Sequence, residues 1–471
     1  MTCCQIKKYK KIDALRNIKR DTKMNETQIL ALFVADTDYG KIPEPACQKA
    51  KACILDYLGS ALYCSRADST NIVSNFVESS GSEAQSTIIG RRWKTTAQYA
   101  ALVNGTMGHG FELDDFHGNA FLHPGTVVIP AALATAEKEN ADGPRLLAAV
   151  VVGYEVMIRI GMALTVSHNF RGFHPTGTCG PFGAAAAAGK ILGLKEEQLL
   201  NALGTAGSLS SGIKEFAVTG SMVKRYHAGK AAENGVVAAQ LALGGLTGPA
   251  SVLEGKFGFL QAFSDQYDLS LLTRELNRQW EIMNINVKPY ACCGGLHSMI
   301  DGLLQIKRTQ RIDPAKTSRI VVETIEKVAL QNSGPGTASL MAAQYSIPFV
   351  AALTLYRNIE DPNVFTESIL SDKEILALSR KVEVRDSIKN AGMEKSRVTV
   401  ETGDGNTFAV DTDMPKGHPK NPLSDDEVKK KFRYLSRNFC GDDKTEEIIK
   451  KIDTLEKIKN LGEVSGLLQA D

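Results

Sequence analysis

The chain has 471 residues, of which 43% are hydrophobic and 23% charged, and its formal net charge is +2 at pH 7. This length predicts two or three domains with ample chain to bury a core, and the composition is ordinary for a soluble globular protein. Because the near-neutral charge leaves no dominant basic face, it argues against nucleic acid as a partner.

The nine cysteines are scattered without the spacing of a metal site, which indicates reduced thiols and a cytoplasmic location. No apolar run approaches the roughly 20 residues that a membrane helix needs, so we expect no membrane partner. Residues 1–23 are rich in Lys and Arg and include Asp13 and Asp21. A mitochondrial presequence is poor in acids, so we interpret this segment as a disordered basic tail.

Apolar spacing at i, i+3 and i+4 predicts that the first part of the chain is mainly helical. The predicted helices cover residues 25–62 in two segments, 96–107, 125–139, 145–164, 182–188, 201–211 and the Ala-rich stretch that ends at 242. Residues 68–90 are rich in Ser, Asn and Gly and predict a loop with one short helix at 71–78.

The segment His174–Pro181 is predicted to be a loop, because its two prolines and two glycines disfavour a helix. It leads into Phe182–Ala188, whose small residues predict a helix that is buried. A Gly-rich loop before a helix N-terminus is a natural site for a small anion. No Gly-Lys-Ser/Thr follows, so the segment is not a P-loop.

The pattern changes near Ile282. β-branched runs at 319–325 and 382–385 predict strands, and residues 398–401 and 407–410 flank a turn signal that predicts a hairpin. Residues 284–415 therefore form a smaller α+β unit. The chain then returns to helix, with Ser424 and Glu427 as a capping box.

These elements predict a mainly α fold class. A large all-helical domain comprises residues 24–283 plus 416–471, and an α+β lid domain, residues 284–415, is inserted near its C-terminal end. Sandwiched between apolar helices of the large domain, residues 109–123 hold three acids and three imidazoles. We call this segment the polar island. Burying a charge costs several kcal/mol unless it is paired, so we expect the island to line a cavity.

Six of the eight histidines lie between residues 109 and 227, and Lys224 and Lys288 stand near Gly or Pro. A metal site of His117 and His123 with Asp114 or Asp115 lacks the His-Glu-x-x-His spacing. A nucleophilic Cys179, Cys292 or Cys293 is disfavoured, because buried cysteines usually serve packing. Acid–base chemistry on a polycarboxylate uses most of the unusual residues: imidazoles move protons, and cations bind carboxylates and stabilise the enolate.

Each of these residues also has a structural alternative. Asp114 and Asp115 could cap a helix or pair with Arg91 or Arg92. His109 follows an apolar helix and is predicted to be a hydrogen-bonded core histidine. We interpret His168, among polar neighbours, as solvated.

A series of motifs resembles the MmgE/PrpD family. They are Asn104–His109 with Asp114-Asp115, His123-Pro124-Gly125, His174–Gly177, Lys224–Gly229, Lys288-Pro289-Tyr290 and Lys416–Leu423. The similarity runs from about residue 26 to 460. The family includes 2-methylcitrate dehydratase, cis-aconitate decarboxylase and iminodisuccinate epimerase, which act on small polycarboxylates without a metal or organic cofactor. The resemblance implies a helical domain with an α+β lid, usually in a homodimer.

The resemblance also implies which residues line the pocket between the domains. The predicted catalytic residues are His174, His123, Lys224, Lys288 and Asp115. The predicted substrate-binding residues are Asp114, Lys224, Lys288, His227 and Tyr290. His174 and His123 are the candidates for proton transfer, and the two lysines would bind carboxylates and stabilise the enolate.

Three departures from the decarboxylase pattern bear on the substrate. The decarboxylase has Thr where Phe116 stands, Asp where Glu112 stands, and His at the position aligned with Cys293. They favour a cofactor-independent lyase that dehydrates a 2-methylcitrate-like substrate. A cis-aconitate-type decarboxylase and an epimerase of an iminodisuccinate-like substrate are the alternatives. Intact His174 and Lys224 argue against a non-enzymatic metabolite-binding protein.

Overall fold

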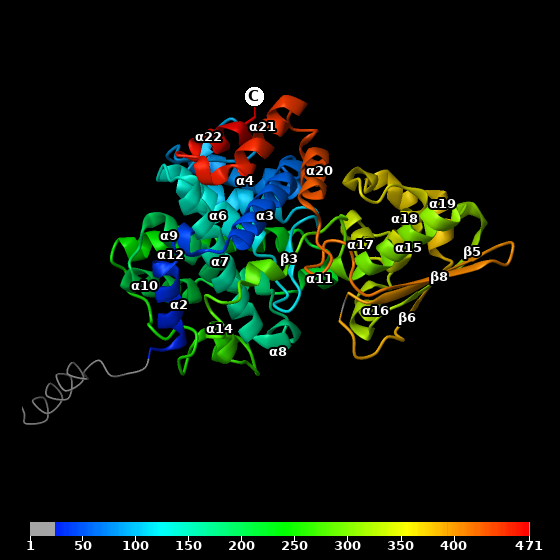
Figure 1. Ribbon diagram of the computed structural model, residues 1–471, viewed down its shortest axis with the longest axis horizontal. Helices are drawn as coiled ribbons and strands as arrows, with labels where there is room; N and C mark the ends of the chain where they lie inside the picture. The colour runs from blue at the N-terminus through cyan, green and yellow to red at the C-terminus, as the bar shows by residue number, and fades with distance from the viewer. Residues whose placement is uncertain (1–23, 393, 471) are drawn as a thin grey trace, which may run out of the picture.

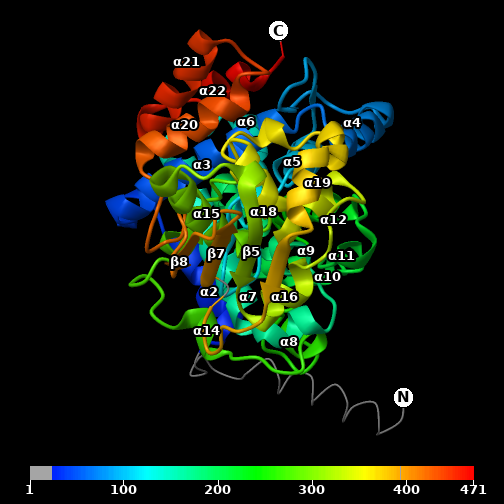
Figure 2. The ribbon, with the colours of Figure 1, turned by 90° about the vertical axis from the view of Figure 1, so that its right-hand side faces the viewer.

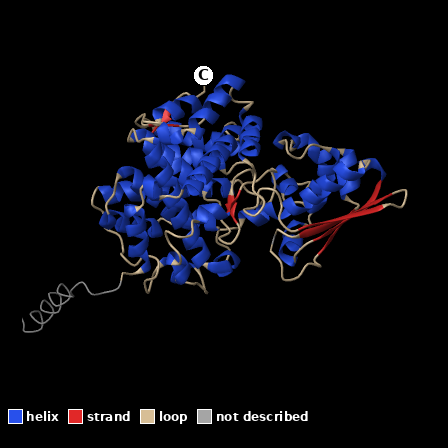
Figure 3. Ribbon diagram, in the orientation of Figure 1, coloured by secondary structure: helices blue, strands red, loops and turns tan. Residues whose placement is uncertain are grey.

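The structure, a computed structural model, describes residues 24–392 and 394–470, and the predicted basic tail at residues 1–23 lies outside them. A larger, mainly helical part holds the N-terminal helices and the C-terminal end of the chain, and a smaller part beside it carries a sheet (Figures 1 and 3). The prediction that the larger part is all-helical is wrong, because β1 (Ser86–Thr87) and β2 (Lys94–Thr95) pair within it. Each part has its own cluster of buried apolar residues. The mainly α fold class is confirmed.

The larger part, which we call the helical part, is built by helices from both ends of the chain. From the N-terminal side they are α2 (Glu26–Asp36), α3 (Glu44–Tyr63), α4 (Asp68–Ser80), α5 (Ala97–Gly108), α6 (Gly125–Lys138), α7 (Gly143–Ala163), α8 (Thr165–Phe170), α9 (Pro175–Leu192), α10 (Glu196–Ser208), α11 (Phe216–Thr219), α12 (Val223–Leu243), α13 (Phe259–Phe263) and α14 (Ser270–Thr273). From the C-terminal side they are α20 (Asp425–Ser436), α21 (Asp442–Asp453) and α22 (Gly462–Ser465). The predicted capping box of Ser424 and Glu427 begins α20, which packs on α3.

Small residues let the central helices α9 and α12 approach closely. A Cβ added at Gly180 of α9 would lie 2.7 Å from the Cβ of Ala231 on α12, a separation that real Cβ atoms do not reach. The segment Phe182–Ala188 is fully buried, as its composition predicts. Close-packed Ala and Gly therefore build the support for the loops that follow these helices.

The predicted loop at His174–Pro181 is wrong, because α9 begins at Pro175. Pro175 occupies the first turn, where its missing N–H removes no helical hydrogen bond. Pro181 lies inside the helix at a cost of about 3 kcal/mol, which the burial of α9 against α7 and α12 offsets. The N–H groups of Gly177 and Thr178 donate to the His174 carbonyl oxygen, so they are not free to bind the predicted anion.

Helix α7 corrects a second prediction, because its 21 residues are long and apolar enough to cross a membrane. In the structure 94% of its most apolar window is buried among the other helices. Two of its three charged groups form a buried pair, with Arg159 Nε 3.0 Å from Glu155 Oε2. The expectation that no apolar run reaches this length was therefore wrong, and α7 is a core helix of the helical part.

The smaller part, which we call the lid, contains both helices and strands. Its helices are α15 (His297–Gln310), α16 (Glu326–Asn332), α17 (Leu340–Gln344), α18 (Ile347–Tyr356) and α19 (Lys373–Ser379). Its strands are β5 (Thr317–Glu323), β6 (Val382–Arg385), β7 (Ser396–Thr402) and β8 (Thr407–Thr412). Both predicted strands and the hairpin are confirmed.

The lid sheet has the strand order β6-β5-β7-β8, with β5 parallel to β6 and antiparallel to β7. Alternate residues of β5 and β7, such as Val322 opposite Val398, are buried. They face α15 and α18, which cover one side of the sheet (Figure 2). Because only one face is covered, the other carries ion pairs such as Arg397–Asp411.

A two-residue ladder joins the helical part to the start of the lid. Strand β3 (Phe116–His117) pairs antiparallel with β4 (Ile285–Asn286), with Phe116 opposite Asn286. Continuing that register places Asp114 opposite Lys288. The ladder therefore brings the polar island to the lysine that follows β4. The domain boundaries at 283/284 and 415/416 stay predictions.

Candidate active site

The polar island lies at the junction of the two parts and is held from both sides. Gln344 of the lid donates a hydrogen bond from Nε2 to the Phe111 carbonyl oxygen at 3.1 Å. Lys431 on α20 donates from Nζ to the Leu113 carbonyl oxygen at 2.7 Å. These side chains fix the backbone on either side of Glu112.

Glu112 joins two lysines that are far apart in the sequence. Its Oε1 accepts from Lys224 on α12, and its Oε2 accepts from Lys288 Nζ at 3.1 Å. The side chains are 2–4% exposed. Burial favours the neutral acid, but the two ammonium groups hold the pKa of Glu112 well below its usual value. The site therefore contains a buried carboxylate that already occupies both lysines.

The backbone of Glu112 has a φ of +55°, in the left-handed region that residues with a Cβ rarely adopt. This conformation costs roughly 1–2 kcal/mol. The conformation is held in place because Lys224 and Lys288 donate hydrogen bonds to the Glu112 carboxylate. Gln344 also donates a hydrogen bond to the carbonyl oxygen of the preceding residue, Phe111. Strain of this kind is concentrated at functional sites.

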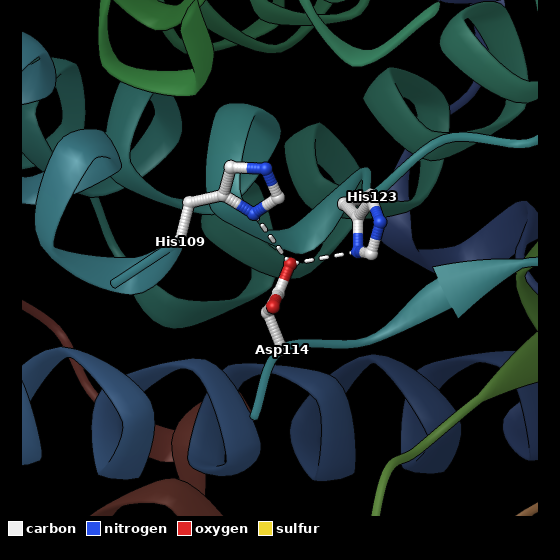
Figure 4. A group of neighbouring side chains, drawn as sticks. All are labelled: His109, Asp114 and His123. Atoms are coloured by element: carbon white, nitrogen blue, oxygen red, sulfur yellow. Dashed lines mark hydrogen bonds and ion pairs between the residues drawn. The ribbon is translucent and has the colours of Figure 1, made fainter. Parts of the chain in front are cut away.

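Asp114 holds two imidazoles through one carboxylate oxygen (Figure 4). Its Oδ2 lies 2.7 Å from Nδ1 of His109 and 2.7 Å from Nδ1 of His123. The His123 Nδ1 also lies 2.8 Å from the Asp115 carbonyl oxygen. Because each Nδ1 faces oxygen acceptors only, each carries the hydrogen, and Nε2 of each ring is the atom that can exchange a proton.

The charges of this group follow from its burial. Burial lowers the pKa of His109 to about 4, although Asp114 opposes the shift, so His109 is neutral at pH 7. Burial opposes the charge of Asp114, but His123, His109 and Lys288 hold its pKa well below the usual value. Asp114 Oδ1 and His109 Nε2 are buried without a hydrogen-bond partner among residues 24–392 and 394–470. These two atoms mark where a polar ligand could bind.

His174 and His227 extend the cluster from α9 and α12. Their Nδ1 atoms lie 3.2 Å apart, so one ring donates to the other. The His174 ring stacks on His109 with 5.8 Å between centroids. Burial and the neighbouring His109 and His227 hold the pKa of His174 well below its usual value. His174 is therefore a neutral imidazole beside the polar island.

Tyr345, which lies between α17 and α18, is a site residue that the sequence did not reveal. Its hydroxyl oxygen accepts from Lys224 Nζ at 3.1 Å, and burial raises its pKa well above the usual value. No charge or histidine marks this position. The available signal was its place directly before Ser346, which caps a strongly apolar helix and so fixes the backbone there.

Two predicted site residues turn their side chains to other partners. Asp115 Oδ2 accepts from the Tyr154 hydroxyl at 2.7 Å, and its Oδ1 accepts from the Gly125 N–H at 3.0 Å. Gly125 is the first residue of α6, so Asp115 caps that helix, one of the alternatives the sequence left open. Tyr290 donates from its hydroxyl to Asp301 Oδ1 at 2.6 Å. The structure thus brings Glu112 together with six of the eight predicted site residues, namely Asp114, His123, His174, Lys224, His227 and Lys288. Asp115 contributes its backbone carbonyl oxygen to this group.

The prediction that His168 is solvated is wrong. The residue is 1% exposed, with Nδ1 2.9 Å from the Phe263 carbonyl oxygen and Nε2 2.8 Å from Thr178 Oγ1. The prediction that His109 is a buried, hydrogen-bonded histidine is confirmed. Asp114 pairs with histidines rather than with Arg91 or Arg92.

A cavity of about 460 Å³ lies between the two parts of the chain, and Phe116, Gly294 and His297 are among its lining residues. The Phe116 ring centroid lies 5.9 Å from Lys288 Nζ. A Cβ added at Gly294 would lie 2.8 Å from the Phe116 ring, so only glycine leaves room for it. Phe116 therefore presents an apolar wall beside Lys288.

His109, Asp114 and His123 also offer ligand atoms within 4.8 Å of one another, close enough to hold a metal ion. Imidazoles and a carboxylate are ligands of catalytic zinc sites. In this structure both Nδ1 atoms lie 2.7 Å from the same Asp114 oxygen, through a hydrogen bond for His109 and an ion-pair contact for His123, and these contacts use atoms that a metal would need. The metal-free site stays a prediction.

Comparison with known proteins agrees with this architecture. The sequence matches the MmgE/PrpD N-terminal domain over residues 28–272 and the MmgE/PrpD C-terminal domain over residues 290–457. The chain belongs to the MmgE/PrpD family. The family resemblance inferred from the sequence is thus confirmed.

The chain is similar to several named enzymes along nearly its whole length. It is 28% identical to the cis-aconitate decarboxylase-like protein oryM of Aspergillus oryzae, over 95% of this chain and 98% of that protein. It is also 28% identical to cis-aconitate decarboxylases of Aspergillus terreus and Homo sapiens, over 95% and 94% of this chain and 96% and 94% of theirs. The chain is a lyase.

Proposed function

We propose that the chain is a cofactor-independent carboxy-lyase that removes CO₂ from a small unsaturated polycarboxylate of the cis-aconitate type. The observation that carries this proposal is the convergence of Lys224 and Lys288 on one buried carboxylate, beside the hydrogen-bonded set of His109, Asp114 and His123. The names of the relatives support the same chemistry.

The two lysines would bind the carboxylate on which negative charge develops. A substrate carboxylate that reaches Lys224 and Lys288 takes over ion pairs that Glu112 makes in this structure. The C–C bond to the departing carboxylate then breaks, CO₂ leaves, and the electron pair forms a new C=C bond. The electrons of the original C=C bond move to the carbon next to the bound carboxylate. Ammonium groups at that carboxylate stabilise the resulting enolate.

One proton completes the reaction, and His123 is the candidate donor. Its Nδ1 is held by Asp114 and by the Asp115 carbonyl, which leaves Nε2 to carry the proton that adds to the carbanion. The Asp114 carboxylate stabilises the protonated imidazole. Since His174 is held neutral by burial, we assign it a hydrogen bond to the substrate rather than the initial proton.

Phe116 is compatible with decarboxylation, although the decarboxylase pattern has Thr at this position. Dehydration expels hydroxide and needs a proton donor beside the leaving oxygen. Decarboxylation turns a charged carboxylate into neutral CO₂, which an apolar wall destabilises less than the charged group. The Phe116 ring lines the cavity between the two parts, and its centroid lies 5.9 Å from Lys288 Nζ, so it presents an apolar surface beside a lysine that would bind substrate. Glu112 and Cys293 further distinguish this pocket from the decarboxylase pattern, which favours an altered substrate.

Proton NMR in D₂O tests the proposal against its alternatives. The purified chain is incubated separately with citrate, 2-methylcitrate, cis-aconitate and iminodisuccinate. We expect loss of CO₂ from the unsaturated substrate with one deuteron added to carbon, and no reaction with Lys288→Met as the matched control. Loss of water from 2-methylcitrate without CO₂ would contradict the proposal in favour of a dehydratase. Deuterium exchange without bond cleavage would favour an epimerase.

We also propose a homodimer and a cytoplasmic location, as the family resemblance and the reduced cysteines indicate. The cysteines at positions 47, 53, 64, 179, 292, 293 and 440 are free thiols. Sedimentation of the purified chain tests the dimer.

A further inference from the structure

The chain passes between the helical part and the lid twice, and the two crossings lie against each other. The first crossing, residues 287–290, follows β4 and contains Lys288, and the second, residues 415–421, leads back to α20. The Val287 N–H donates to the Gly417 carbonyl oxygen at 3.0 Å. Gly417 has a φ of +87°, and a Cβ added there would lie 2.0 Å from the Val287 carbonyl oxygen, so only glycine allows this approach. The second crossing therefore fixes the backbone directly before Lys288.

One carboxylate of the lid binds both crossings. Asp301 lies on α15 and is half-buried. Its Oδ1 accepts from the Tyr290 hydroxyl in the first crossing at 2.6 Å, and its Oδ2 accepts from the Lys416 N–H in the second at 2.6 Å. Asp301 thus holds the first crossing two residues after Lys288, and it holds the segment that fixes the backbone before Lys288. We call Asp301, Tyr290, Lys416 and Gly417 the clasp.

The clasp is anchored in the helical part as well as in the lid. Lys416 Nζ lies 2.8 Å from Glu427 Oε2, and the same oxygen accepts from the Ser424 N–H at the start of α20. The Tyr290 side chain is 4% exposed. Its ring packs edge-on against His297, with 5.3 Å between centroids. Tyr290 is therefore fixed both at its ring and at its hydroxyl.

Lys288 is the site residue that these contacts orient. Both Val287 before it and Tyr290 after it are hydrogen-bonded within the clasp, and Pro289 restricts the backbone between them. The Lys288 side chain is 2% exposed, with Nζ 3.1 Å from Glu112 Oε2. A displacement of about 1 Å at a reacting group can cost roughly 100-fold in rate. Contacts that fix this backbone therefore bear on the chemistry without touching the substrate.

We propose that Asp301 is a positioning residue, which aligns Lys288 with the substrate carboxylate by joining the two crossings beside it. The inference rests on the proposed function for the role of Lys288 in the reaction. It accounts for the turn of Tyr290 away from the cavity, where the sequence predicted a substrate contact. It also gives a role to the motif Lys416–Leu423, which supplies the backbone of the second crossing.

A double-mutant cycle on stability tests the clasp without turnover. Tyr290→Phe removes only the hydroxyl that Asp301 binds. If this bond orients Lys288, its ion pair with Glu112 is weaker in Tyr290→Phe, so Glu112→Gln costs less stability there than in wild type. We expect the two costs to differ by about tenfold in the unfolding equilibrium constant, measured in urea. Additive losses are the result of a merely structural tyrosine and would overturn the proposal.

The matched control for this cycle is Tyr267→Phe. It removes a tyrosine hydroxyl that donates to Gln261 Oε1 at 3.0 Å in the helical part. Glu112→Gln should cost as much stability in this background as in wild type. An equally reduced cost in Tyr267→Phe would mean that the effect is not specific to the clasp, and would also count against it.

Steady-state kinetics on cis-aconitate give a second measurement. A displaced Lys288 loses stabilisation of the enolate, so Tyr290→Phe should lower kcat and kcat/KM together by about tenfold. Asp301→Ala should lose at least as much. Asp301→Asn should keep most of the activity, because an amide can still accept from the Lys416 N–H and donate to the Tyr290 oxygen. A rise in KM with unchanged kcat, or full activity of Asp301→Ala, would refute the positioning role.

The two measurements separate this inference from the proposed function. If no substrate reacts but the stability cycle is non-additive, the proposed function is refuted and the clasp stands. If wild type releases CO₂ but the losses of stability are additive, the clasp is refuted and the proposed function stands.

Discussion

The replacement Glu112→Gln tests the charge arrangement at the centre of the site. It keeps the size and the left-handed backbone of Glu112 but removes the charge that Lys224 and Lys288 share. Breaking a buried ion pair costs about 3–5 kcal/mol. Lys288 keeps a weaker partner, since its Nζ lies 3.9 Å from Asp114 Oδ1. We therefore expect the free energy of unfolding to fall by about 3 kcal/mol, the lower end of that range.

Urea unfolding with and without tricarballylate, a saturated tricarboxylate, measures the effect. A bound carboxylate replaces the charge that Glu112→Gln lacks, so the ligand should stabilise this variant more than wild type. Glu112→Asp, one methylene shorter, should lose less stability. Glu446→Gln is the matched control, because Glu446 pairs with Arg433 on the surface and its loss should cost about 1 kcal/mol or less.

The pH dependence provides a second check on Glu112. Its folded pKa lies below the usual value of 4.5, so its stabilisation is complete above about that pH and is lost as the pH falls. Glu112→Gln should lack that part of the acid destabilisation. Unchanged stability of Glu112→Gln, together with an unchanged response to tricarballylate, would refute the reasoning.

Three further changes test other parts of the site. Burial raises the pKa of Asp115 from 3.8 to about 7, so the folded state keeps a proton that the unfolded state has lost. Wild-type stability should therefore fall by up to about 4 kcal/mol between pH 4 and pH 7. In Asp115→Asn this fall should be absent. If urea unfolding gave wild type and Asp115→Asn the same dependence of the unfolding free energy on pH, the result would contradict this role of Asp115. Phe116→Thr introduces the residue of the decarboxylase pattern and should raise kcat/KM for cis-aconitate about tenfold, or by about 1.4 kcal/mol, because a hydroxyl can bind a substrate carboxylate that the ring excludes; an equal or lower kcat/KM measured by NMR would count against a contact between the ring and the substrate. Treatment with a metal chelator followed by dialysis should leave turnover unchanged, and a loss that added zinc restores would indicate a metal at His109, Asp114 and His123.

Much of the fold could be predicted because burial imposes a period on the sequence. The spacing of apolar residues predicts α5, α6 and α7, and β-branched runs predict β5 and β6. The same approach fails at Pro175 and Pro181, where local propensity disfavours a helix but tertiary packing stabilises one. Context also misleads for His168, whose polar neighbours in sequence are not its neighbours in space.

The site was predictable where residue type alone signals chemistry. His109, His123, Lys224 and Lys288 attract notice because buried charges and imidazoles need partners. Glu112 was noticed only as a departure from the decarboxylase pattern, because its pairing with two lysines depends on the register of β3 and β4. Pairings between segments more than a hundred residues apart are set by tertiary contacts, which no local pattern encodes.

Tyr345 and Asp301 illustrate the same limit within the lid. Neither residue type is unusual for a surface or a core. They become notable when the lid meets the helical part, where Tyr345 contacts Lys224 and Asp301 accepts from the Lys416 N–H. Residues that act across an interface between two parts of a chain are found from the structure.

Release of labelled CO₂ tests the central claim most directly. Cis-aconitate labelled with ¹³C in its carboxylates is incubated in D₂O with wild type and with Lys288→Met. Wild type is predicted to release one equivalent of ¹³CO₂ and to add one deuteron to carbon for each substrate consumed, and Lys288→Met is predicted to release none. No ¹³CO₂ from wild type, or equal release from the two proteins, would contradict the assignment of this buried lysine site as a decarboxylase.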